Sequence, residues 1–119
     1  MMKIHYIKIP VTNIHTSTEW YANVLGLHKE FMDENEGVAR LYFTEGPFII
    51  LIRTNDGQNC NFTKNKETEQ IVTFTNPDVH DLYKRMKEQN VRVSELDKDD
   101  WSVFFKFYDP DGNMFLVHS

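Results

Sequence analysis

The sequence predicts an α+β fold in which two tandem βαβββ modules form a curled mixed sheet around a cleft. The first observation behind this prediction is a turn followed by a strand, which occurs at residues 45–51 and again at residues 107–117. In the second copy, Asp109-Pro110-Asp111-Gly112, proline fixes one turn residue and glycine supplies a positive φ. Because apolar segments flank this turn, it predicts a β-hairpin.

The spacing of the two copies is the second observation. Two residues that can cap a helix, Asn13 and Asp78, are separated by almost the same number of residues as the turn glycines Gly46 and Gly112. A tandem duplication explains this agreement. The alternative is a ferredoxin-like fold with the order β-α-β-β-α-β, but that order leaves several extended segments without a place.

The first module is predicted to span residues 1–54. Residues 3–11 are expected to form a strand, and Asn13 can cap a helix whose apolar residues repeat at helical spacing until Gly26 ends it. Three further strands are expected at residues 28–32, 38–44 and 48–53.

The second module is predicted to span residues 69–119, after a polar linker at residues 55–68. A strand at residues 70–75 precedes a helix that Asn76-Pro77-Asp78 opens, with proline in the first turn, and that Asn90 can close. Three more strands are expected at residues 91–94, 101–108 and 113–118. With 119 residues, 40% of them hydrophobic, the chain can form a single domain with a real core, spanning residues 1–119.

Charge and hydropathy restrict the partners. The 13 Lys and Arg residues against 18 Asp and Glu residues give a net charge of −5, so we expect no nucleic-acid partner. The longest apolar run, residues 48–52, is far shorter than a membrane span, and residues 1–5 do not resemble a secretory signal. We therefore expect no membrane partner and a cytoplasmic location. The acidic stretch at residues 95–100 is interpreted as a solvated loop, and Cys60 as an unreactive thiol without an activating base.

Several motifs together resemble the vicinal oxygen chelate superfamily, the group of glyoxalases, bleomycin resistance proteins and extradiol dioxygenases. They are residues 7–14 (IKIPVTNI), Ser17, Trp20-Tyr21, Val24-Leu25-Gly26 and residues 108–113 (YDPDGN). The resemblance covers nearly the whole chain. It implies two βαβββ modules around a cleft that holds a divalent metal in many members, and it implies a homodimer, because members often complete their clefts with a second chain.

The residues at the family's metal-ligand positions are unsuited to a metal. The resemblance places these positions on the first and last strands of each module, where this chain has Tyr6, Ile71, Ile50 and Leu116. Zinc prefers thiolate or imidazole, and iron and manganese prefer imidazole and carboxylate. We therefore expect no metal and no other cofactor, and a divalent metal only if this register is misassigned.

His5 is the alternative first ligand. Successive strand residues point to opposite faces, so His5 would face the cleft only if Lys8 turned into the core. Burial of an unpaired lysine is unfavourable by several kcal/mol. The register with Lys8 in the cleft is therefore favoured unless a β-bulge intervenes.

The same alternation predicts which residues line a ligand-binding cleft. They combine aromatic and aliphatic side chains with three cations: Tyr6, Lys8, Arg40, Tyr42, Phe48, Ile50, Ile71, Thr73, Phe104, Lys106, Tyr108, Met114, Leu116 and His118. By the same rule, Trp101, Val103, Phe105 and Phe107 are expected in the core under the helix.

Two interpretations of this lining stay open. In the first, the side chains only fill a barrel-like sheet while Lys8, Arg40 and Lys106 reach solvent along their aliphatic stems. In the second, the aromatic and aliphatic walls bind a flat or greasy small molecule, and the cations fix an anionic group. The net acidity of the chain suits a cationic ligand instead, so the charge of the ligand is open.

The function that follows is binding of a small organic molecule without the usual metal site, as in the bleomycin-resistance branch that the chain resembles. Whether any reaction is catalysed is open, and the sequence identifies no catalytic residue. One alternative is a metal-dependent glyoxalase-like lyase, ring-cleavage dioxygenase or thiol transferase. Another is a structural or regulatory protein with an exposed apolar patch.

Overall fold

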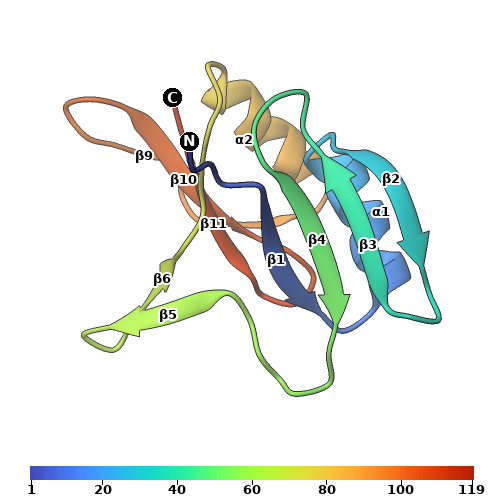
Figure 1. Ribbon diagram of the computed structural model, residues 1–119. Helices are drawn as coiled ribbons and strands as arrows, with labels where there is room; N and C mark the ends of the chain where they lie inside the picture. The colour runs from blue at the N-terminus through green and yellow to red at the C-terminus, as the bar shows by residue number, and fades with distance from the viewer. The chain divides into compact units, whose positions relative to one another are not determined.

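The computed structural model describes residues 1–119 and divides the chain into two units, residues 1–59 and residues 60–119. Each unit has its own sheet and one helix, and the helices and most of the strands are labelled in Figure 1. This mixture of two helices with mixed sheets is the α+β fold that the sequence predicts. Neither helix is long and apolar enough to cross a lipid bilayer.

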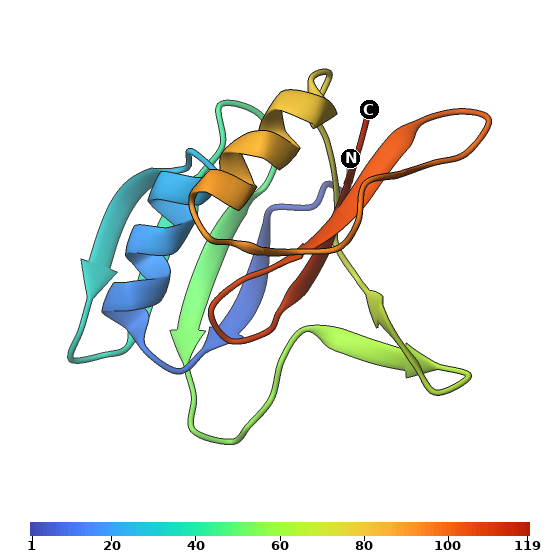
Figure 2. The ribbon, with the colours of Figure 1, turned by 180° about the vertical axis from the view of Figure 1, so that it is seen from behind.

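The first unit contains a four-stranded sheet with the strand order β1-β4-β3-β2. β1 runs parallel to β4, whereas β4 and β3, and β3 and β2, are antiparallel. Helix α1 covers one face of this sheet, as Figures 1 and 2 show from opposite sides. The strands are β1 (Tyr6–Val11), β2 (His28–Asp33), β3 (Val38–Tyr42) and β4 (Phe48–Arg53).

Helix α1 (Ile14–Val24) begins and ends where the sequence predicts. Asn13 Oδ1 accepts a hydrogen bond from the backbone N–H of Thr16 at 3.0 Å, which satisfies one of the free donors of the first turn. Gly26 follows the helix with a φ of +71°, the left-handed conformation that glycine adopts easily. The alternating residues of the sheet that are buried on the helix side are Ile9, Val11, Ala39, Leu41, Ile49 and Leu51.

The second unit contains a sheet with the strand order β7-β11-β10-β8, to which β9 adds by pairing with β10. Helix α2 (Val79–Glu88) packs on one face, where the Tyr83 and Phe105 rings meet edge to face with centroids 4.9 Å apart. β7 is parallel to β11, and the other pairs are antiparallel. The strands are β7 (Thr73–Thr75), β8 (Arg92–Val93), β9 (Asp97–Lys98), β10 (Val103–Tyr108) and β11 (Met114–His118).

The segment predicted as a polar linker contains a hairpin. β5 (Asn61–Lys64) pairs with β6 (Glu67–Gln70), and the two residues between them both have positive φ, as a tight hairpin turn requires. Because β6 takes Gln70, the strand expected at residues 70–75 begins only at Thr73. Ile71 therefore lies outside every strand and is 66% exposed.

A buried polar network attaches this hairpin to the turn between β10 and β11. Asn113, which is 0% exposed, accepts a hydrogen bond from the Cys60 backbone N–H at 2.8 Å and donates one to Asp109 Oδ2 at 2.7 Å. Asn61 donates to the Gly112 carbonyl at 2.9 Å and accepts from the Met114 backbone N–H at 2.8 Å. The turn motif therefore fixes a segment that lies 51 to 53 residues earlier in the chain.

Two further predictions about the second unit are wrong. Helix α2 begins at Val79 with Asp78 as its cap, so Pro77 precedes the helix and does not lie in its first turn. Trp101 is 91% exposed and lies in the turn between β9 and β10, not in the core. Asp99 Oδ1 accepts hydrogen bonds from the backbone N–H groups of Trp101 and Ser102, both at 2.8 Å. Because these bonds hold residues 99–102 in a local turn, Trp101 does not join the strand.

Candidate functional site

The face of the first sheet opposite α1 carries six of the residues predicted to line a cleft. The strand register places Tyr6 opposite Phe48, and Lys8 opposite Ile50, which in turn lies opposite Arg40. Directly opposed residues point to the same face of a sheet, so one face holds this set. Its members are Tyr6, Lys8, Arg40, Tyr42, Phe48 and Ile50.

Arg40 differs from the free cation that the sequence suggests. Its Nε lies 2.7 Å from Glu30 Oε2 in an ion pair, in which the N–H does not point squarely at the carboxylate. Its guanidinium carbon lies 3.8 Å from the centroid of the Phe48 ring, within cation–π distance. The charge of Arg40 is therefore balanced by Glu30 in a partly exposed ion pair, which leaves Lys8 as the cation of this face without an ion pair.

Phe48 is the centre of an aromatic cluster at the start of β1 and β4. The Tyr6 ring stacks on it with centroids 5.4 Å apart, and the His5 ring meets it edge to face at 4.7 Å. The register between β1 and β4 runs without interruption from Tyr6 to Val11, so the β-bulge that would make His5 the strand-borne ligand is not present. His5 instead packs as a ring against Phe48.

The face of the second sheet opposite α2 carries the second set of predicted residues. Phe104 lies opposite His118, Lys106 opposite Leu116, and Leu116 opposite Thr73. Since Phe105 faces α2, these neighbours face away from the helix. The set is Thr73, Phe104, Lys106, Tyr108, Met114, Leu116 and His118, and only Ile71 lies outside its sheet.

Two residues change the character of this second face. Met114 is only 1% exposed, so its side chain belongs to the core and offers little surface to a ligand. Arg92, which the sequence analysis does not assign to the site, lies opposite Tyr108 and holds its guanidinium carbon 4.0 Å from the Tyr108 ring centroid. The alternation along residues 91–94 could have indicated Arg92, because it shares a face with Tyr108.

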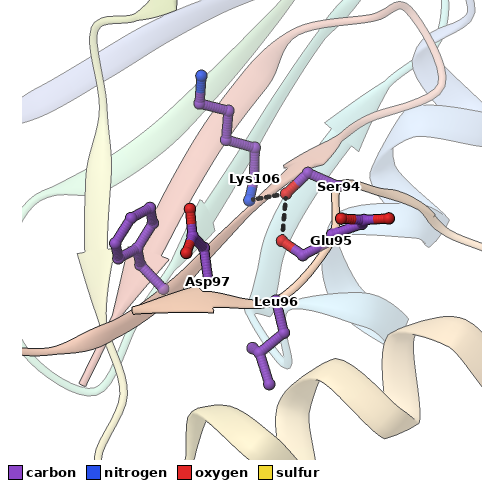
Figure 3. Close-up of a pocket in the computed structure, with 6 residues that line it drawn as sticks. Ser94, Glu95, Leu96, Asp97 and Lys106 are labelled. Carbon is purple, nitrogen blue, oxygen red and sulfur yellow. Dashed lines mark hydrogen bonds between the residues drawn. The ribbon is translucent and has the colours of Figure 1, made fainter. Parts of the chain in front are cut away.

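The second unit also contains a cavity of about 480 Å³, shown in Figure 3. Two of its six lining residues, Phe104 and Lys106, are in the predicted set. The others come from the segment between β8 and β9, which the sequence analysis treats mainly as a solvated acidic loop. They are Ser94, Glu95, Leu96 and Asp97.

Neither unit gathers a donor set that fits a metal. No group of three or more His, Cys, Asp or Glu side chains lies close enough together within either unit to hold an ion. At the positions where the family places ligands, Ile50 and Leu116 have no donor atom, and Tyr6 is a phenol whose ring packs on Phe48. The residue types at these three positions are therefore poor ligands for zinc, iron or manganese.

Cys60 is not arranged for nucleophilic chemistry. Burial and, to a smaller extent, the nearby Asp109 carboxylate together raise the pKa of its thiol to about 11. The thiolate, which is the nucleophilic form, is thus disfavoured at neutral pH.

Comparison with known proteins places these features in a family. The model of the Glyoxalase/Bleomycin resistance protein/Dioxygenase superfamily matches residues 3–117. A search of curated proteins found no significant match.

Solved structures share the fold at low sequence identity. TnmS3, an antibiotic binding protein from Streptomyces sp. CB03234, is 16% identical with a TM-score of 0.78, over 98% of this chain and 94% of that one. FosX, a fosfomycin resistance protein from Listeria monocytogenes, is 15% identical with a TM-score of 0.79, over 99% and 93%. A superfamily member from Sphaerobacter thermophilus DSM 20745 is 22% identical with a TM-score of 0.78, over 99% and 97%.

Proposed function

We propose that this chain, which belongs to the Glyoxalase/Bleomycin resistance protein/Dioxygenase superfamily, binds a small organic molecule without a metal ion. The observation that carries the proposal is the Phe48 cluster on the face of the first sheet opposite α1. There the Phe48 ring is contacted by the Arg40 guanidinium and by the Tyr6 and His5 rings, while Glu30 balances the charge of Arg40. These contacts prearrange a flat aromatic surface beside an apolar strand.

The dimensions of this face suit a flat ligand of one or two rings. Lys8, Ile50 and Arg40 occupy one row across three adjacent strands. Neighbouring strands are about 4.8 Å apart, so the Cα atoms at the two ends of the row are about 10 Å apart. Ile50 forms the floor of this row. Because Arg40 and Tyr6 already contact the Phe48 ring, an aromatic ligand would stack on the Tyr6 ring, which is 43% exposed and which Phe48 supports, and this stacking would add about 0.5–1.5 kcal/mol beyond the burial of area.

The similar structures support the same class of function. One of them is described as an antibiotic binding protein and another as a fosfomycin resistance protein, and both names concern small organic molecules. The metal-dependent alternatives, a glyoxalase-like lyase, a dioxygenase or a thiol transferase, have no donor set within either unit to support them. The homodimer and the cytoplasmic location stay predictions from the sequence.

The proposal is tested with 2-naphthol, a neutral two-ring probe, titrated into chelator-treated protein while backbone amide NMR shifts are followed. We expect saturable shifts in β1 and β4, and an affinity at least fivefold lower in the variant Phe48→Leu, which keeps an apolar side chain but removes the ring. Phe62→Leu is the matched control, because Phe62 is an exposed ring on β5. Equal affinity in Phe48→Leu and the unmodified chain, or binding only after metal is added, would contradict the proposal.

A further inference from the structure

We infer that the cavity of the second unit binds an organic ammonium ion, with the Asp97 carboxylate pairing with the charge and the Phe104 ring contacting the apolar part. This inference rests on the proposed function, because it names the charge of one class of ligand. The cavity is a different site from the Phe48 cluster of the first unit, since all of its lining residues lie between positions 94 and 106 of the chain.

The strand register brings the carboxylate and the ring together. Asp97 on β9 lies directly opposite Phe104 on β10. Directly opposed residues of an antiparallel pair share a face, with Cβ atoms about 4.5–5.5 Å apart. An ammonium group can therefore contact the Asp97 oxygens and the face of the Phe104 ring at once, which combines charge pairing with a cation–π interaction.

The cavity wall that carries the carboxylates is held by hydrogen bonds. Ser94 Oγ accepts a hydrogen bond from the Lys106 backbone N–H at 2.8 Å and donates one to the Glu95 carbonyl at 3.1 Å, as Figure 3 shows. Asp97 Oδ1 accepts from the Lys98 backbone N–H at 2.8 Å, which restricts the carboxylate. The segment is thus hydrogen-bonded to β10 at Ser94 and paired with β10 at Asp97, which lowers the cost of ordering it around a ligand.

The charges that line the cavity favour a cation. Glu95 and Asp97 bring two negative charges and Lys106 one positive charge, and neither carboxylate forms an ion pair with Lys106. In Figure 3 the Lys106 side chain runs away from Ser94. The cavity therefore keeps a net charge of −1, and the chain's net charge of −5 attracts cations over a longer range.

The shape of the cavity selects an organic cation over a bare metal ion. Its volume of about 480 Å³ is that of a site for a small organic ligand, and Leu96 and Phe104 give it apolar surface. The cavity offers only two carboxylates, and no group of three or more His, Cys, Asp or Glu side chains forms there to hold a metal ion.

The test compares three probes of one shape: benzylamine, benzyl alcohol and benzoate. Titrations are followed through the amide NMR signals of residues 94–97 and 104–106 in the full chain. We expect benzylamine to bind at least fivefold more tightly than either other probe. Asp97→Asn should weaken benzylamine at least fivefold, whereas Lys106→Gln should tighten it, because that change removes the competing cation.

Asp100→Asn is the matched control, since it removes the same charge from the exposed turn that follows β9 and Asp100 does not line the cavity. Tighter binding of benzoate, or equal weakening by Asp97→Asn and Asp100→Asn, would overturn the inference. If the unmodified chain binds 2-naphthol at the first sheet but does not bind benzylamine, this inference is overturned and the proposed function stands. Absence of binding for every probe would overturn both.

Discussion

Replacement of Asn113 by alanine should destabilise the fold by about 3 kcal/mol. The Asn113 side chain is fully buried and makes two hydrogen bonds that alanine cannot make. Loss of the bond to the Asp109 carboxylate is worth about 1.5–3 kcal/mol, and loss of the bond from the Cys60 N–H about 1 kcal/mol. We also expect the β5–β6 hairpin to lose its protection from hydrogen exchange first, because Asn113 holds the residue that precedes β5.

Urea unfolding monitored by circular dichroism measures this prediction, with the denaturant slope checked for constancy. Asn55→Ala is the control, because Asn55 is an exposed loop residue, and its substitution should change the free energy of unfolding by less than about 0.5 kcal/mol. A loss below about 1 kcal/mol for Asn113→Ala would refute the reasoning, since it would mean that the network contributes no more than one ordinary hydrogen bond.

Two further predictions concern a turn and a thiol. At Gly37 (φ +67°) an added Cβ would lie 2.8 Å from Arg53 Cβ, so Gly37→Ala should destabilise the fold by about 2–3 kcal/mol in the same urea assay. At the control position Gly57 (φ +68°) an added Cβ meets no atom within 4 Å, so Gly57→Ala should cost only about 1 kcal/mol. Equal losses of stability in the two variants would contradict the steric argument. Because burial raises the pKa of Cys60 to about 11 from its ordinary value of 9.0, its reaction with iodoacetamide at pH 8 should be about a hundredfold slower than in urea-unfolded protein and should rise with pH up to about 11. Equal rates in folded and unfolded protein would contradict it.

The sequence predicts well the features that local chemistry determines. Asn13 and Asp78 cap their helices because a side-chain oxygen within three residues of a free N–H is sufficient. The alternation along β1, β3 and β4 is equally reliable, because a helix buries one face of the sheet and a shift by one residue would expose the whole core.

The features that the sequence misses depend on distant contacts. The β5–β6 hairpin is polar, and its attachment comes from Asn113 and Gly112, more than 50 residues later. The pairing of Arg40 with Glu30 follows a shift in the β2–β3 register between Lys29 and Phe31, which no residue pattern announces. This pair lowers the positive charge expected at the predicted cleft, because Glu30 balances Arg40, one of the three predicted cations.

The cavity in the second unit was missed for a related reason. An acidic run such as residues 95–100 has the composition of a solvated loop, and only the β9–β10 pairing brings Asp97 beside Phe104. The same pairing could not be inferred from a two-residue strand, since so short a segment has no periodicity to detect.

The most direct test of the central claim is isothermal titration calorimetry of chelator-treated protein with nickel, manganese, zinc and iron(II), each with and without a saturating organic probe. Because Tyr6, Ile50 and Leu116 stand at the positions expected to hold metal ligands, we predict no stoichiometric metal binding. We also predict that the affinity for 2-naphthol is the same with and without each metal ion. Tight binding of one ion per chain, or a probe affinity that depends on the ion, would contradict the account and favour a metal-dependent enzyme.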